Sequence, residues 1–496
     1  MNSALLPKLQ ASITKRGLKR NAADALPVVA LSVLATAYAR TLAPSITWAH
    51  NGADSGDLAV AAVTLGVAHP SGYPTYVLLA QPFLRIPLGE AAFRLNLLSA
   101  TAGLLACLVI YALVRRLGAR AWGARAAALA ALALGTAPLF WSQAVIAEVY
   151  TLNALFAALL LWCMAAPPAT WRGWLAHGLV AGLALGNHVT IGLFVMAWLL
   201  SSCLRLSLRR SMTIRQLAAA IAGLAVGLSV YLYVPLRAAA HPAVNWGSAD
   251  TWGGFWWLVT GALYRPLAFG LPLAQAGERL RDGGALLLRQ FSGPGLALAV
   301  VGLCYGAPRM RRWLWVSAAL VAAQAVFALG YNTPDYAVHL IPVLVILAIW
   351  IGLGAATVLQ SLYTRRALVT PFAAVAIGVA LLWPLPATFA QVNASGDTQA
   401  RTYAVNELAA APPNAVVLTA EDRDSFALLY GRVALGQRPD TAVMIEPLLQ
   451  FGWYRANMRA VYTGLRIPEP PADDWRELLA AANPTRAIVR ATPLTP

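Results

Sequence analysis

The sequence predicts an all-α polytopic membrane protein that carries a small α/β domain at its C-terminal end. Of its 496 residues, 59% are hydrophobic and only 11% are charged, and the mean hydropathy is positive at +0.62. An average soluble protein has about 25% charged residues. Apolar runs of about 18 residues or more are typical of transmembrane helices, and this chain contains many of them.

About eleven apolar segments are long enough to be membrane spans. The basic region from Lys8 to Arg20 leads into the first of them without a small-residue cleavage site, so we expect no cleaved signal peptide. The segments lie near 27–45, 92–114, 122–140, 145–165, 172–187, 189–204, 214–235, 293–307, 313–330, 338–359 and 368–386.

The net charge of +17 is distributed as a topology signal. With a cytoplasmic N-terminus, 19 of the 37 basic residues fall on inner segments and seven fall on the outer loops before residue 387. Lys and Arg are enriched in the cytoplasmic loops of membrane proteins. We therefore expect membrane lipids rather than nucleic acid around this chain, and a C-terminal end outside the cytoplasm after eleven spans.

The chain divides into two predicted domains. Residues 1–386 form the membrane domain, with two long outer loops at 46–91 and 236–292. Residues 387–496 are too polar to span a membrane and alternate between short strand and helix patterns, which is typical of an α/β domain. The expected strands are Ala415–Thr419, Thr441–Ile445 and Ala487–Arg490, and the expected helices are Asp424–Leu435 and Trp453–Val461.

The first outer loop contains Asp54-Ser55-Gly56-Asp57, followed by His69-Pro70-Ser71-Gly72-Tyr73-Pro74. Ionisable groups next to a membrane are costly and indicate function. One interpretation makes Asp54 and Asp57 catalytic, with a carboxylate acting as general base. The other makes them the capping box of a helix that follows. His69 and Tyr73 are candidate substrate contacts, or parts of a rigid turn set by Pro and Gly.

Other polar residues at the outer ends of spans are also candidate substrate-binding residues. Arg237 suits a phosphate, because a guanidinium donates two parallel hydrogen bonds, although snorkelling toward lipid head groups explains it equally well. The remaining candidates are Glu148, His188, Asn245, Arg265 and Asp335, for which a helix start or a turn is the structural alternative.

Motifs for nucleotides and metals are missing from the sequence. There is no phosphate-binding Gly-rich loop, no dinucleotide fingerprint and no Cys/His zinc spacing, and the four cysteines lie within or beside spans. We expect no metal site, and an activated donor outside the cytoplasm would be lipid-linked.

Several short sequence motifs, taken together and in their order along the chain, resemble those of a known family. This family is the membrane proteins related to transmembrane protein 260, which are protein O-mannosyltransferases of the GT-C superfamily. The resemblance covers most of residues 45–350. It is carried by the two first-loop motifs together with Arg94–Ala100, Trp141–Ala144, Ala147–Asn153, Gly186–His188, Pro235–Arg237, Asn245–Gly247 and Tyr331–Asp335.

The resemblance implies a GT-C fold in a bacterial inner membrane, with an active site on the extracytoplasmic side. The donor would be a polyprenyl-phosphate sugar, typically mannose, and the acceptor a protein Ser or Thr, a lipid or a cell-wall glycan. Asp54 matches the acidic residue that GT-C enzymes carry in the first outer loop. The second acid of this family is usually Glu, whereas here it is Asp57.

The mechanism that follows is one inverting displacement with Asp54 as base and Arg237 stabilising the leaving phosphate. A divalent cation between Asp54, Asp57 and the phosphate is compatible with these residues, but no cofactor is required. The rival hypothesis is a transporter or flippase of a lipid-linked or envelope substrate. Transporters place charged groups near the bilayer midplane, and these spans are nearly uncharged there.

Overall fold

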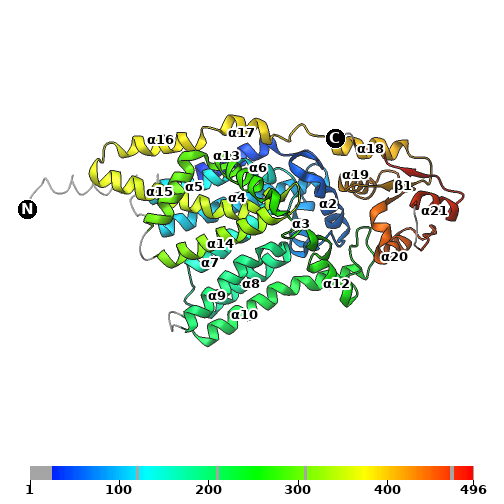
Figure 1. The fold of residues 1–496 in the computed structure, drawn as a ribbon, viewed down its shortest axis with the longest axis horizontal. Coiled ribbons are helices and arrows are strands. Elements are labelled where there is room, and N and C mark those ends of the chain that lie inside the picture. The colour runs from blue at the N-terminus through cyan, green and yellow to red at the C-terminus, as the bar shows by residue number, and fades with distance from the viewer. Residues whose placement is uncertain (1–24, 119–121, 208–211, 307–309, 470–473, 495–496) are drawn as a thin grey trace, which may run out of the picture.

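The computed structural model describes residues 25–118, 122–207, 212–306, 310–469 and 474–494. Long helices form one end of the molecule, and a small domain near the C-terminus forms the other end (Figure 1). Some basic residues used for the predicted orientation lie outside the described residues, namely those from Lys8 to Arg20 together with Arg120, Arg209, Arg210 and Arg309.

The described residues contain seven helices that are long and apolar enough to cross a membrane. An eighth is added if α5 and α6, which meet at a bend of 70°, form one span. Shorter helices occupy the other predicted spans, so each of the eleven has a helix in its place, and the chain is a multi-pass membrane protein. The helices are Ala25–Thr41, α4 (Ala91–Leu117), α5 (Gly123–Gly135), α6 (Pro138–Ala144), α7 (Tyr150–Ala165), α8 (Trp171–Asn187), α9 (Gly192–Ser207), α10 (Ile214–Leu228), α13 (Leu273–Tyr305), α14 (Arg311–Gly330), α15 (Ile341–Arg365) and α16 (Thr370–Leu382).

Helix α13 is longer than the span expected at 293–307, because it begins at Leu273 inside the expected second outer loop. Its first half carries charged residues such as Glu278 and Asp282, which keep this stretch out of any apolar run. The two halves meet at Ser292, whose backbone is not helical. The outer segment that precedes α13 therefore ends at Pro272.

Glycines allow α8 and α10 to pack with their backbones in contact. A Cβ atom on Gly178 would lie 2.0 Å from the carbonyl oxygen of Ala220, and one on Gly223 would lie 2.0 Å from that of Leu175. Close approach through small residues is a common way for transmembrane helices to associate. Helix α15 lies at the centre of the bundle, with 89% of its apolar window buried, whereas only 11% of the α16 window is buried.

The two outer segments are tied together beside the bundle. The N–H of Val67 donates to the oxygen of Val244 over 2.9 Å, and the N–H of Trp246 donates to the oxygen of Val67 over 3.2 Å. This pairing brings residues of both segments to one end of the helices. The short helices concerned are η1 (Ala49–Asp54), α2 (Ser55–Thr64) and α3 (Pro74–Leu84) in the first segment, and α11 (Tyr233–Ala238), α12 (Trp252–Val259) and η4 (Ala262–Leu267) around the second.

The residues after the bundle confirm the predicted small α/β domain. Three strands, β1 (Val416–Thr419), β2 (Ala442–Ile445) and β3 (Ile488–Arg490), form a parallel sheet in the order β2-β1-β3. Val417 of the central strand pairs with Val443 on one side and Val489 on the other. The helices are α17 (Leu385–Val392), α18 (Gln399–Ala410), α19 (Asp422–Leu429), α20 (Gly452–Val461) and α21 (Trp475–Ala482).

Candidate active site

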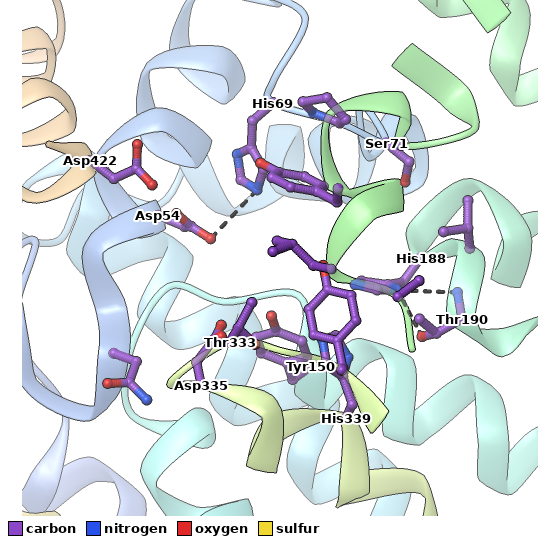
Figure 2. Close-up of a pocket in the computed structure, with 18 of the residues that line it drawn as sticks. Asp54, His69, Ser71, Tyr150, His188, Thr190, Thr333, Asp335, His339 and Asp422 are labelled. Atoms are coloured by element: carbon purple, nitrogen blue, oxygen red, sulfur yellow. Dashed lines mark hydrogen bonds and ion pairs between the residues drawn. The ribbon is translucent and has the colours of Figure 1, made fainter. Parts of the chain in front are cut away.

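A cavity of about 890 Å³ is lined by residues at one end of the helix bundle and by residues of the C-terminal domain. Polar side chains from distant parts of the chain point into it (Figure 2). Its lining includes Trp48, Asp54, His69 and Tyr73 from the first outer segment, Tyr150, His188 and Thr190 from α7 and the α8–α9 junction, Tyr264 and Arg265 from η4, Tyr331, Asp335 and His339 from the α14–α15 connection, and Asp422 and Arg423 from α19.

Backbone geometry explains why Asp54 faces this cavity. Helix η1 runs directly into α2, and His50 and Asn51 adopt positive φ angles of 59° and 61° just before Asp54. The Ser55 hydroxyl donates to the oxygen of Gly52 over 2.6 Å and holds the junction. The Asp54 side chain makes no capping hydrogen bond, and 34% of it is exposed to the cavity. The predicted capping box is therefore absent, because neither carboxylate caps the helix.

Asp57 has a different role in the structure, because its carboxylate is fully buried and holds His69. One oxygen accepts hydrogen bonds from the main-chain N–H of His69 over 2.9 Å and from its ring Nδ1 over 2.7 Å. The other oxygen accepts from the indole N–H of Trp246 over 3.1 Å. Asp57 is therefore a positioning residue for the imidazole and has no free oxygen facing the cavity.

His69 lies between the two carboxylates. Its Nε2 is 3.5 Å from Asp54, opposite the Nδ1 that Asp57 holds. Burial alone would lower the pKa of His69, but the charges of Asp54 and Asp57 outweigh burial and raise that pKa to about 9. The imidazole is therefore protonated at neutral pH and offers a positive charge to Asp54.

Asp54 has an acid–base character suited to proton transfer. Burial raises its pKa, the positive His69 counteracts this, and the nearby carboxylate of Asp422 adds to the rise, with a resulting pKa of about 6. A general base is most effective when its pKa lies near the working pH. Asp54 is thus mostly ionised at pH 7 and still basic enough to accept a proton.

The C-terminal domain supplies part of the cavity through α19. The ring of Phe426 stacks on His69 with centroids 6.2 Å apart. A Cβ atom on Gly56 would lie 2.3 Å from the carbonyl oxygen of Phe426, so only glycine at this position leaves room for α19. The glycine in the Asp-Ser-Gly-Asp motif therefore permits the two domains to dock.

Asp422 and Arg423 are site residues that sequence reasoning missed. Both precede the buried helix-capping residue Asp424, whose carboxylate accepts hydrogen bonds from the N–H groups of Ala420, Glu421 and Ser425. Asp422 points toward the cavity next to Asp54 (Figure 2). The available signal was an acidic cluster at the carboxyl end of a parallel strand, where ligand sites of α/β folds commonly lie.

Six of the ten predicted site residues line the cavity, namely Asp54, His69, Tyr73, His188, Arg265 and Asp335. Asp57 and Glu148 lie behind the lining. Glu148 is only 2% exposed, and its main-chain N–H donates a hydrogen bond to the Ser99 hydroxyl over 3.2 Å. The Glu148 carboxylate nevertheless contributes to the raised pKa of His69.

Arg237 and Asn245 do not line the cavity. Arg237 donates to the carbonyl oxygens of Leu65 over 2.7 Å and Thr64 over 3.2 Å, which are the free carbonyls at the end of α2. Asn245 donates to the oxygen of Ala238 over 3.1 Å and to the Asn457 side chain over 3.2 Å. The structure thus gives both residues contacts that hold outer segments in place.

Among the described residues, no group of three or more His, Cys, Asp or Glu is arranged to hold a metal ion. The divalent cation therefore stays a prediction. The cationic lining groups are Arg265 and Arg423, with the protonated His69 beside them. The positive charges of these three side chains favour the binding of an anionic group.

Comparison with known proteins gives related sequences. Residues 54–211 match the model of the protein O-mannosyl-transferase TMEM260 N-terminal domain. The mouse protein O-mannosyl-transferase TMEM260 is 27% identical over 480 residues, which cover 90% of this chain and 66% of that protein. The Dictyostelium discoideum protein of the same name is 32% identical over 127 residues, or 25% of this chain and 15% of that protein. The chain thus spans just under two thirds of the mouse relative and a small part of the other.

Solved structures share the fold. ArnT from Cupriavidus metallidurans bound to undecaprenyl phosphate superposes with a TM-score of 0.54 at 16% identity, covering 86% of this chain and 91% of that chain. The oligosaccharyltransferase of Archaeoglobus fulgidus, in complex with zinc and sulfate, gives 0.53 at 15% identity, covering 84% of this chain and 62% of that chain. The predicted resemblance is confirmed: this chain resembles the transmembrane protein 260 family and has a fold of the GT-C glycosyltransferase type.

Proposed function

We propose that this chain is an integral-membrane glycosyltransferase that moves mannose from a polyprenyl-phosphate donor to a protein Ser or Thr hydroxyl outside the cytoplasm. The observation that carries the proposal is Asp54, a partly exposed carboxylate with a pKa of about 6 that faces a large cavity beside a protonated His69. The names of the TMEM260 relatives support the reaction and the acceptor. The undecaprenyl phosphate bound to ArnT, which shares the fold, supports the donor class.

In the proposed reaction Asp54 is the general base. The acceptor oxygen forms a bond to the anomeric carbon while the bond between that carbon and the phosphate oxygen breaks. The acceptor proton passes to Asp54, and polyprenyl phosphate leaves with the electron pair. One displacement inverts the anomeric centre. Asp57 acts through His69, because it holds the imidazole that orients the Asp54 carboxylate.

The leaving phosphate needs stabilisation of its growing charge. We assign this task to Arg265 in place of Arg237, because the guanidinium of Arg265 lines the cavity while that of Arg237 is bonded to the end of α2. Arg265 donates to the hydroxyl of Thr260, which also lines the cavity. This contact directs the guanidinium while leaving further N–H groups for a phosphate.

Rings on the wall away from Asp422 suit the sugar. The Tyr73 and His188 rings lie 5.8 Å apart, and those of Tyr331 and His339 lie 4.9 Å apart. The His188 Nδ1 accepts from the N–H of Thr190 over 3.3 Å, so its Nε2 carries the hydrogen and acts as a donor. Asp335 offers an acceptor for sugar hydroxyls from the same wall.

The proposed location is a bacterial inner membrane, with the cavity and the C-terminal domain outside the cytoplasm. Helix ends support this orientation. The ends of α4, α9 and α15 that lead away from the cavity carry Arg116, Arg205 and Arg365. Basic residues mark the cytoplasmic side of membrane proteins.

The transporter hypothesis is less well supported. The long helices α7, α8 and α14 contribute lining residues only at or beside their ends, namely Tyr150, His188 and Phe327. The central helix α15 is buried from Ile341 to Ala356. A transport path needs a site near the midplane that both sides reach in turn, and this cavity lies at one end of the bundle.

The test is transfer of labelled mannose from polyprenyl-phosphate mannose to Ser/Thr peptides by the purified protein. Loss of a general base costs about 10²–10⁴-fold in rate, so Asp54→Asn is expected to lose activity by that factor while keeping its donor KM. Asp250→Asn, at an exposed carboxylate that does not line the cavity, is the matched control. Full activity of Asp54→Asn, or transport of an unmodified lipid by the wild type without transfer, would overturn the proposal.

A further inference from the structure

A second cavity of about 570 Å³ adjoins the candidate active site on the side of the C-terminal domain. Trp48 and Arg423 line both cavities, so their side chains form the wall between them. The remaining lining comes from the connection between α17 and α18, including Asn393, Asp397 and Gln399. The two cavities therefore meet at Trp48 and Arg423.

The wall consists of the Trp48 indole and the Arg423 guanidinium, which are in contact with each other. The guanidinium carbon of Arg423 lies 4.8 Å from the centre of the Trp48 ring, and the Trp48 indole N–H donates to the main-chain oxygen of Arg423 over 3.0 Å. Tyr403 packs against the same indole with centroids 5.5 Å apart. Among the described residues Arg423 forms no ion pair, and the contact that holds its guanidinium is the one with the Trp48 ring.

The chemistry of the second cavity suits a polypeptide better than a lipid. Its lining includes the amides of Asn393 and Gln399, the Asp397 carboxylate and the Thr398 hydroxyl, and Trp48 is the one large apolar side chain among the described lining residues. The Asn393 oxygen accepts from the N–H and hydroxyl of Ser395 over 3.1 Å and 2.8 Å, which leaves its NH₂ group as a donor. Such donors and acceptors match the N–H and C=O groups of an extended backbone.

Charge along the route also selects the acceptor. Asp397 lines the second cavity, and Asp422 and Asp54 follow on the far side of the wall, so three carboxylates along this route face two cationic groups in the described lining, Arg423 and the protonated His69. An excess of carboxylates repels an anionic acceptor, such as a phosphorylated glycolipid. A neutral or basic segment bearing a hydroxyl group meets no such repulsion.

We propose that this second cavity binds the acceptor as an extended peptide and passes its Ser or Thr side chain between Trp48 and Arg423 to Asp54. This inference rests on the proposed function, because it specifies how the acceptor of that same reaction enters. The phosphate of the polyprenyl donor is assigned to the first cavity, where Arg265 is part of the lining. The C-terminal domain is then the acceptor-recognising part of the enzyme.

Kinetics with a hydroxyl-bearing peptide tests the inference. The double variant Asn393→Ala/Gln399→Ala is expected to raise the acceptor KM about tenfold with little change in kcat or donor KM, and Trp48→Ala is expected to raise it further. Gln437→Ala is the matched control, because Gln437 is exposed on the same domain and lies outside both cavities. An unchanged acceptor KM in the double variant, with normal donor KM, would overturn the inference.

Cross-linking separates failure of this inference from failure of the proposed function. A photoreactive phenylalanine analogue in place of Gln399 is expected to capture the peptide, and the same analogue in place of Gln437 is not. Mannose transfer without capture at position 399 would exclude this route while keeping the enzyme. Capture of the peptide without any mannose transfer would keep the binding site and exclude the proposed reaction. Stronger capture of an anionic glycolipid than of the peptide would overturn the acceptor class.

Discussion

Asp54 and Asp57 stand three positions apart, and their surroundings give them different chemistry. Asp54 faces the cavity, whereas Asp57 is enclosed and accepts hydrogen bonds from His69 and Trp246. A carboxylate whose oxygens are occupied by such donors is a poor base. The shorter Asp at the second position of the motif therefore suits a positioning role, in which reach toward a substrate is not needed.

The ionisation of Asp54 and His69 predicts a bell-shaped pH profile for sugar transfer. The value of kcat/KM should rise as the pH passes about 6, where Asp54 loses its proton, and fall above about 9, where His69 loses its positive charge. The measurement is kcat/KM over this pH range, with His69→Gln for comparison. The variant should lose the alkaline limb, and a wild-type rate independent of pH between about 5 and 7 would contradict the assignment of Asp54.

The same ionisation makes stability depend on pH. Because folding raises the pKa of His69 from 6.5 to about 9, the folded protein binds this proton more tightly than the unfolded chain. The resulting contribution to the free energy of unfolding is complete below pH 6.5 and is lost as the pH rises toward 9. The Tm of the wild type should therefore fall as the pH rises from 6.5 to about 9. The Tm of His69→Gln should fall less over the same pH range.

Arg265 and Arg237 make a matched pair for the phosphate assignment. Arg265→Ala should raise the donor KM about 10- to 100-fold, because a charged hydrogen bond contributes about 1.5–3 kcal/mol. Arg237→Ala should instead lower the Tm, since it frees the carbonyls at the end of α2, and should leave the donor KM nearly unchanged. Steady-state kinetics and thermal unfolding on both variants distinguish the roles, and the reverse pattern would restore the phosphate role to Arg237.

At the scale of elements, α2 and α19 are the pair that assembles the site. Gly56 of α2 lies against the carbonyl of Phe426, whose ring covers His69, and α19 brings Asp422 into the cavity. The Asp54–Asp57 motif, whose local pattern predicts the start of a helix, thus also forms a docking surface for α19, which lies more than 360 residues later in the sequence.

Gly56→Ala is expected to weaken this docking. The added methyl group would overlap the Phe426 carbonyl, and overpacking of this kind costs about 1–3 kcal/mol. Gly277→Ala on α13 is the control, because nothing lies within 4 Å of the position of its Cβ atom. Both variants are compared by Tm and by mannose transfer, and a Gly56→Ala protein with wild-type values for both would show that α19 does not depend on this contact.

Sequence reasoning succeeded where the signal is local. Hydropathy located the eleven helical segments, and alternating short patterns located the strands near 416–419, 442–445 and 488–490. It could not find the contact between α19 and His69, because no local pattern encodes a pairing between such distant segments. The contacts of Arg237 could not be predicted for the same reason. Its position near a membrane surface suggested a phosphate contact, whereas in the structure it donates to the carbonyl oxygens of Leu65 and Thr64, which are far away in sequence.

At the scale of the whole molecule, the cavity, the C-terminal domain and the basic helix ends define the proposed orientation. The cavity and the domain share one end of the bundle, and Arg116, Arg205 and Arg365 terminate helices that lead away from it. In this proposed orientation, the active site would face the compartment in which lipid-linked donors, rather than nucleotide sugars, are expected.

Labelling with a membrane-impermeant maleimide tests this orientation in intact cells. In a background with the exposed Cys203 and Cys304 replaced by alanine, Gln437→Cys should be labelled and Arg365→Cys should not. Both positions should react after the cells are permeabilised. Labelling of Arg365→Cys alone in intact cells would invert the proposed topology.

The docking of α19 has a consequence for the protein during its synthesis. The cavity that contains Asp54 is closed by residues near position 422, so a nascent chain that has not been synthesised that far has the base but no finished site. If the chain has the proposed activity, we expect catalysis to begin only after α19 has been synthesised and has docked. Under the proposed function, we expect a chain truncated before α19 to insert into the membrane but to transfer no mannose, because it lacks Asp422, Arg423 and their part of the cavity lining.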